Sequence, residues 1–158
     1  MNMRIDCGEY ELLNFKRHLT DFEPLQFVDE DNLNKLINTL EHLIIGDDSL
    51  NGDITQLSFV SFHRLKTINI GANCCQDVTK FELKQLQVLE SVFIDTESFT
   101  PDPIWEDDGI KYYMQGQEIE YGSFSCCDCP SLTSLVISSD AFKFYSEFTL
   151  SREYKIIE

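Results

Sequence analysis

The sequence predicts a strand-rich solenoid in which successive windings of the chain stack a parallel β-sheet along one wall. Three observations support this fold class. Four stretches of similar sequence recur along the chain, each alternates apolar and polar residues as a strand does, and the first three begin 25 and 24 residues apart. A winding of this size cannot bury its apolar residues alone, so stability must come from stacking on its neighbours.

The four stretches share apolar residues at offsets 0, 3, 5 and 10 and a polar residue at offset 8. Side chains at offsets 3 and 5 lie on one side of a strand and are expected to face the core, which turns offsets 2 and 4 outward. The fourth stretch begins 43 residues after the third. The stretches are LEHLIIGDDSL (40–50), LKTINIGANCC (65–75), LESVFIDTESF (89–99) and LTSLVISSDAF (132–142), with Asp48, Asn73, Glu97 and Asp140 at offset 8.

A second alternating pair of apolar residues occurs once per repeat, on the far side of the predicted winding. Phenylalanine and β-branched neighbours dominate these positions, and both residue types favour strand over helix. A short extended segment on the opposite wall is therefore expected. The pairs are Leu57 and Phe59, Phe81 and Leu83, Phe124 and Cys126, and Phe148 and Leu150.

The shared form L-x-x-L-x-L-x-x-polar-x-apolar resembles the signature of the leucine-rich repeat family, whose repeats span about 20 to 29 residues. The segment CPSLTSLVI (129–137) is most similar to the irregular variant of bacterial surface antigens and protists. The resemblance covers about residues 54–157, and only Asn73 supplies the family's asparagine at offset 8. It implies a strand-rich α/β leucine-rich-repeat solenoid with a parallel concave sheet and short extended segments or turns on the convex side.

Residues 1–39 lack the repeat and are expected to form a small, partly helical N-terminal cap, with the solenoid over residues 40–158. Helices are predicted over 9–19, where Leu12, Phe15 and Leu19 share one side, and over 31–39, where Asp31 is suited to the N-cap. At the other end, SREYKIIE begins a further repeat, so the last repeat is predicted to be incomplete.

About 19 extra residues separate the third and fourth stretches and predict an inserted loop at about 100–121. It contains Trp105, Tyr112, Tyr113 and several acidic residues, and aromatic anchors beside charge are typical of interaction hot spots. The alternative is a hairpin whose rings pack down on the solenoid, turning at 107–109 or at 115–116.

Composition narrows the choice of partner. The chain has 158 residues, 28 of them acidic and 12 basic, and its formal charge is −16. This charge repels phosphate and anionic lipid and favours a basic partner, so neither nucleic acid nor membrane is expected as a partner. Adjacent cysteines and the lack of Asn-x-Ser/Thr sites predict a reducing, intracellular and cytoplasmic location.

The stretch DDSLNGDITQLS (47–58) partly fits a twelve-residue calcium loop. Asp47, Ser49, Asn51 and Gly52 match positions 1, 3, 5 and 6, but Ser58 stands at position 12, where a bidentate Glu belongs. The repeat also predicts a strand before the loop, whereas a calcium-binding hand has helices on both sides. A solvated turn is the preferred interpretation.

The cysteines allow a zinc site, because CCDC (126–129) together with Cys74 and Cys75 could supply the four thiolates that such a site needs. Cys75, Cys126 and Cys129 nevertheless occupy apolar repeat positions, which favours buried free thiols over zinc or a structural disulfide. His18, His42 and His63 lie in no catalytic motif, and no phosphate loop or nucleophile elbow is present. No enzymatic activity, cofactor or metal is predicted.

The outward strand positions carry the stronger functional signal. An apolar row that faces solvent either binds a partner or is covered by the inserted loop or another chain. We expect a non-catalytic protein-interaction module, a scaffold for a basic protein partner; the alternatives are a structural subunit or fragment of a larger leucine-rich-repeat assembly and a calcium- or zinc-dependent sensor. The candidate partner-binding residues are Ile44, Asn69, Phe93 and Val136 at offset 4, His42, Thr67, Ser91 and Ser134 at offset 2, and Trp105, Tyr112 and Tyr113 in the insertion.

Overall fold

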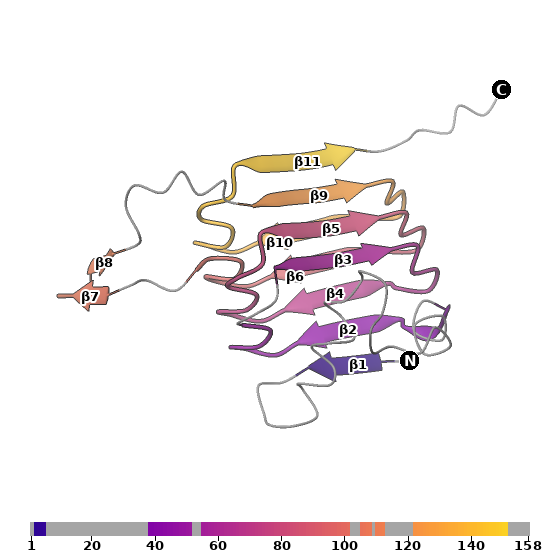
Figure 1. Ribbon diagram of the computed structural model, residues 1–158. Helices are drawn as coiled ribbons and strands as arrows, with labels where there is room; N and C mark the ends of the chain where they lie inside the picture. The colour runs from indigo at the N-terminus through magenta and orange to yellow at the C-terminus, as the bar shows by residue number, and fades with distance from the viewer. Residues whose placement is uncertain are drawn as a thin grey trace.

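The structure is a computed structural model and describes residues 2–5, 38–51, 55–101, 105–108, 110–112 and 122–151. In these residues the chain is almost entirely strand and turn, and helical structure is confined to Asn38 and Thr39. Two parallel sheets form two layers, and the chain passes from one to the other and back (Figure 1). The strand-rich, parallel-sheet part of the prediction is confirmed.

Sheet A is the first layer, and its strand order is β1-β2-β4-β6-β10. All its strands run parallel and pair at equal offsets, so His42 lies beside Thr67 and Thr67 beside Ser91. Residues at one offset therefore form a straight row across the sheet. Its strands are β1 (Asn2–Ile5), β2 (His42–Ile45), β4 (Thr67–Ile70), β6 (Ser91–Ile94) and β10 (Ser134–Ile137).

Sheet B is the opposite layer, with the order β11-β9-β5-β3, and it confirms the extended segments expected on the far wall. From β2 onwards each winding of the chain adds one strand to sheet A and one to sheet B, with two further strands inserted between them in the third winding, an arrangement consistent with a solenoid-like fold. The strands of sheet B are β3 (Gln56–Val60), β5 (Lys80–Lys84), β9 (Ser123–Cys127) and β11 (Glu147–Ser151).

The core lies between the two sheets and is filled by the inward residues of both. In the first three windings these residues are at most 4% exposed, from Leu43 and Ile45 to Cys126. Phenylalanines stack along the winding axis: the rings of Phe99 and Phe142 have centroids 4.5 Å apart and planes 12° apart, and Phe81 lies 4.7 Å from Phe99. Stacked rings add to the stabilisation that comes from apolar burial, so they connect one winding to the next.

Backbone conformation repeats together with the sequence. Offsets 8 and 10 of every winding have a left-handed φ between 53° and 59°. This conformation lets the amide of Asp48 donate to Ala72 O of the next winding (2.9 Å) and that of Cys75 to Ser49 O of the previous one (3.1 Å). Asp and Asn tolerate it better than most residues, which accounts for the polar residue at offset 8. The left-handed residues are Asp48, Asn73, Glu97 and Asp140, followed at offset 10 by Leu50, Cys75, Phe99 and Phe142.

The start of the chain differs from the prediction in one respect. Residues 2–5, which the sequence places in the cap, form strand β1 and pair in parallel with β2, from Asn2 beside His42 to Ile5 beside Ile45. The backbone pairing available at the edge of β2 explains a strand at this position. Apart from helical residues 38 and 39, the predicted helices over 9–19 and 31–39 lie outside the described residues.

The fourth winding differs from the prediction at its inward positions. Ile137 is 39% exposed, Phe148 52% and Leu150 65%, although the residues equivalent to them in the preceding windings are buried. The reason is topological, because β10 and β11 are the last strands at that end of both sheets and no described strand covers them.

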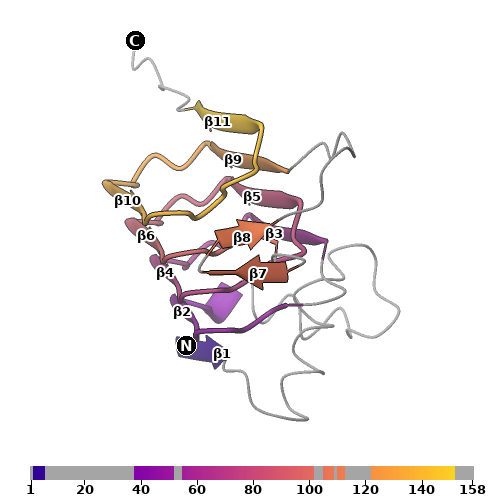
Figure 2. The ribbon, with the colours of Figure 1, turned by 90° about the vertical axis from the view of Figure 1, so that its left-hand side faces the viewer.

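The described part of the insertion is an antiparallel hairpin of β7 (Trp105–Asp107) and β8 (Ile110–Tyr112). Asp107 pairs with Ile110, so the chain turns between these two residues, at the first of the two predicted turns. Asp108 has the positive φ that such a tight turn requires. The hairpin stands off the side of the molecule at which the strands of sheet A end (Figures 1 and 2).

Candidate interaction surface

The two predicted rows lie side by side on the outer face of sheet A. The register places Ile44 beside Asn69, Asn69 beside Phe93, and Phe93 beside Val136. Strand alternation turns this row away from the core, and the row at offset 2 points to the same side. Four strands that lie up to 92 positions apart in the chain therefore present a single surface. The second row consists of His42, Thr67, Ser91 and Ser134.

Exposure distinguishes the two rows. Ile44 is 37% exposed, Phe93 38% and Val136 46%, so large apolar side chains lie on the surface. Asn69 is also exposed and separates Ile44 from the adjacent pair Phe93 and Val136. The row at offset 2 is half-buried except for Ser134, which is exposed. The surface thus has an apolar line beside a polar line of small side chains.

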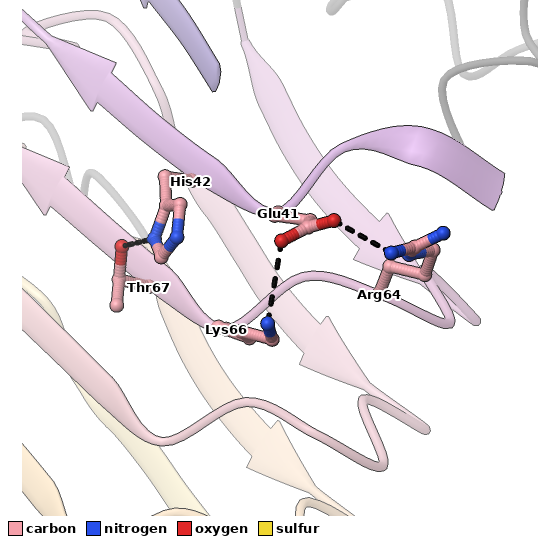
Figure 3. A network of polar contacts seen from close by, with 5 residues as sticks. All are labelled: Glu41, His42, Arg64, Lys66 and Thr67. Carbon is pink, nitrogen blue, oxygen red and sulfur yellow. Dashed lines mark hydrogen bonds and ion pairs between the residues drawn. The ribbon is translucent and has the colours of Figure 1, made fainter. Parts of the chain in front are cut away.

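A polar network lies beside the rows where β2 and β4 begin (Figure 3). The Glu41 carboxylate accepts from Arg64 at 2.7 Å and from Lys66 at 3.3 Å, and His42 Nδ1 shares a hydrogen bond of 2.8 Å with Thr67 Oγ1. The hydrogen bond from Lys66, together with the positive charges of Lys66 and Arg64, holds the pKa of Glu41 below its ordinary value. The network connects the first two windings, and the single carboxylate of Glu41 neutralises part of the positive charge of Arg64 and Lys66.

The sequence prediction did not include this network, although the signal was present. Glu41 and Lys66 stand at offset 1 of consecutive repeats, and parallel strands in register bring equal offsets together. Arg64 lies one position before the next repeat begins, close enough for its long side chain to reach the same carboxylate. Opposite charges at one offset therefore predict an ion pair between windings.

The opposite end of the same strands is acidic. Offsets 6, 7 and 8 follow each strand directly and carry a carboxylate in three of the four windings. Some of these acids also shape the turns: Asp47 Oδ1 accepts from Ala72 N at 2.9 Å, and Asp95 Oδ1 accepts from Thr96 N at 2.7 Å. The acidic rim consists of Asp47, Asp48, Asp95, Glu97 and Asp140.

The hairpin leaves the molecule on the side of the acidic rim (Figure 2). Trp105 and Tyr112 are cross-strand partners at its open end, so the backbone brings these two predicted anchors to one place. Tyr113 lies outside the described residues. The hairpin thus stands away from the two sheets, on the side where the strands of sheet A end (Figure 1).

The partial calcium loop forms a turn between strands β2 and β3, which replace the helices of a calcium-binding hand. Its polar groups bond to the next winding: Asn51 Nδ2 donates to Asn73 O at 2.8 Å, and Asn51 Oδ1 accepts from Gln76 N at 3.0 Å. Ser49 is fully buried. Residue types that would suit a calcium loop thus hold this segment by contacts with the next winding. Gly52 and Ile54 lie outside the described residues.

The cysteines at apolar repeat positions lie in the core, as predicted: Cys75 is 0% exposed, Cys126 4% and Cys129 3%. Burial raises the pKa of the Cys75 thiol well above its ordinary value. Cys74 is also buried, and its thiol donates to Gly46 O at 3.0 Å in the first winding. Among the described side chains, no three His, Cys, Asp or Glu residues are grouped so that they could share a metal ion.

Comparison with protein-family models, with curated proteins and with solved structures finds no match for this chain. Across the described ranges, no helix has the length and the apolar character that crossing a membrane requires.

Proposed function

We propose that this chain is an intracellular leucine-rich-repeat solenoid that binds a protein partner on the outer face of sheet A. The repeat assignment is supported by the spacing of the windings, by strands that pair at equal offsets and by left-handed residues that recur at offsets 8 and 10. In this role the chain binds and performs no chemistry.

One observation carries the proposal: the exposed apolar row across four parallel strands. The core of a protein interface is apolar, and its rim is polar and open to solvent. Phe93 and Val136 are adjacent in this row, and Ser91 and Ser134 lie directly beside them. A rigid sheet holds these side chains in place before a partner arrives, which reduces the entropy lost on binding.

The charge of the surface defines the partner. The acidic rim lies along one border of the row, and on the other border Arg64 and Lys66 share the one carboxylate of Glu41. A partner segment with apolar side chains flanked on one side by Lys or Arg matches this arrangement. Complementary charge mainly accelerates association and sets orientation, so salt is expected to slow binding more than it weakens the apolar contact.

The hairpin supplies a second contact in this proposal. It leaves the molecule on the side of the acidic rim, and Trp105 and Tyr112 pair across its two strands. A basic segment lying over the rim would meet these two residues next, and aromatic rings attract Lys and Arg side chains. The hairpin therefore widens the surface towards its acidic border.

The test is a capture experiment with matched variants. Phe93→Asp places a charge in the middle of the row, and Val60→Asp places the same charge on the outer face of sheet B, where Val60 is 36% exposed. Proteins from the source cells that bind the wild type and Val60→Asp, but not Phe93→Asp, identify the partner. Trp105→Ala reports separately on the hairpin. Retention of every bound protein by Phe93→Asp would overturn the proposed surface.

A second function, as a subunit of a larger assembly, is favoured by one further observation. Ile137, Phe148 and Leu150 are 39% to 65% exposed at the end of the two sheets, and apolar side chains gathered at a strand edge favour association. Sedimentation over a range of concentrations tests this role. Assembly that Leu150→Asp abolishes supports a subunit, and a monomer at all concentrations excludes assembly from identical chains.

A further inference from the structure

Cys126 and Cys129 lie together in the wall of a cavity that shares only Ser134 with the proposed binding rows. The cavity has a volume of about 400 Å³ and lies at the end of the core, between the last strands of the two sheets. Both thiols are almost fully buried in the wall of this cavity. Its other lining residues are Leu132, Thr133, Ser134, Leu135, Leu150 and Ser151.

The repeat explains why these two side chains are neighbours. β9 ends at Cys127, and the left-handed Asp128 (φ 56°) turns the chain so that residues 126 and 129 both face inward. The equivalent residues of the first winding, Phe59 and Phe62, have ring centroids only 5.4 Å apart. Two thiols occupy much less volume than two phenyl rings, which leaves room for a small molecule beside them.

The two thiols differ in acidity. A hydrogen bond from the Cys126 thiol to the Cys129 sulfur lowers the pKa of Cys129, and the backbone N–H of Leu86 acts in the same direction, while burial and the charge of Asp128 oppose it. The same hydrogen bond, together with burial, raises the pKa of Cys126. A more acidic thiol beside a less acidic one is the arrangement of a nucleophile and a resolving thiol.

We propose that Cys126 and Cys129 are a modification site at which a small disulfide compound is reduced while the two thiols join in an intramolecular disulfide. The Cys129 thiolate attacks one sulfur of the compound, forms a mixed disulfide and releases the first thiolate. Cys126 then loses its proton and attacks Cys129 Sγ, which forms the Cys126–Cys129 bond and releases the second thiolate. Two electrons pass from the protein to the compound, and a protein disulfide is the product.

The cavity and the net charge define the class of compound. Leu132, Leu135 and Leu150 provide an apolar wall, and a formal charge of −16 repels anions. A neutral, apolar disulfide is therefore expected to react faster than an anionic one. The proposal does not rest on partner binding, because none of these three leucines belongs to the apolar row.

The test uses 2,2′-dithiodipyridine, a neutral disulfide that releases coloured pyridine-2-thione. Cys7→Ser and Cys127→Ser are introduced first, which leaves the pair together with Cys74 and Cys75. Both of the latter are 0% exposed and serve as internal controls. The folded protein is expected to release two thiones, to lose about 2 Da and to carry no adduct. Peptide mapping should then show a bond between residues 126 and 129.

Two variants separate the roles of the thiols. Cys126→Ser should release one thione and keep a stable pyridyl adduct on Cys129, because no resolving thiol remains. Cys129→Ser should react at least about tenfold more slowly, because it removes the thiol that attacks the disulfide compound. Circular dichroism checks that each variant is folded. The peptide map of the parent protein, which keeps both Cys126 and Cys129, tests the proposal even if neither variant folds. A persistent adduct on the parent, or a bond between other cysteines, would overturn the proposal.

Discussion

Phe99→Ala tests whether the aromatic stack holds the windings together. Phe99 is fully buried at offset 10 of the third winding, with its ring stacked 4.7 Å from Phe81 and 4.5 Å from Phe142. The substitution removes a ring that stacks on both Phe81 and Phe142, whose own centroids lie 6.2 Å apart, and leaves a cavity between neighbouring windings. Ala keeps the left-handed φ of 55°, so relief of backbone strain does not offset the loss.

The expected destabilisation is about 3–5 kcal/mol, the range for truncating a buried phenylalanine. The upper half of this range is expected, because two stacked neighbours lose their partner and each aromatic pair adds about 0.5–1.5 kcal/mol beyond burial. Domains of this size are stable by only about 5–15 kcal/mol, so the variant loses a large share of the total. Phe93→Ala is the matched control, since Phe93 is 38% exposed and its truncation should cost about 1 kcal/mol or less.

Urea unfolding followed by circular dichroism measures both variants, with the free energy of unfolding extrapolated to water. The account predicts that Phe99→Ala lowers the midpoint far more than Phe93→Ala does. Equal losses for the two variants, or a loss below about 1 kcal/mol for Phe99→Ala, would show that the stack does not couple the windings.

Three further predictions concern the turns and the ion pairs. At Gln85, whose φ is 55°, a Gly variant should be more stable than an Ala variant by about 1 kcal/mol, and urea unfolding giving the reverse order would refute the left-handed assignment. Gly71→Ala should lose about 1–3 kcal/mol in the same assay, because the new methyl group would lie 2.8 Å from Asp47 N, and an unchanged midpoint would contradict this contact. The pKa of Glu41 is lowered from 4.5, so its ion pairs stabilise the fold above that pH and lose this effect as the pH falls through the folded-state pKa. The stability difference between wild type and Glu41→Gln should therefore shrink in acid, and a constant difference across pH would argue against the pairing.

Much of the fold was predictable because the repeat restricts each position physically. Offsets 3 and 5 are apolar in all four windings, and only a strand places both on one side of the chain. Equal offsets then fix the register, which is why the rows through Ile44 and His42 follow from the repeat alone. The turn between Asp107 and Ile110 followed from Asp108-Gly109, a pair suited to a tight hairpin.

Other features depend on neighbours that the repeat does not encode. β1 lies outside the repeat, so its side chains give no periodic signal. It joins sheet A by pairing its backbone with that of β2. Ile137 and Leu150 stand at inward positions of the repeat but remain exposed. The apolar pattern predicts which way a side chain points, whereas its burial also requires a neighbouring strand that covers it. The left-handed Asp128 between Cys126 and Cys129 does belong to the repeat, since Ser61 and Gln85 are left-handed at the equivalent positions, but this backbone conformation gives no signal in the apolar pattern.

The proposed surface is tested most directly by the affinity of the captured partner for Phe93→Asp and Val60→Asp, measured by titration calorimetry with purified proteins. If the exposed row of sheet A is the binding site, Phe93→Asp weakens binding by at least about 2 kcal/mol, or roughly thirtyfold, as expected of a hot-spot residue. Val60→Asp then binds like the wild type. Equal affinities for the two variants would show that the partner binds elsewhere.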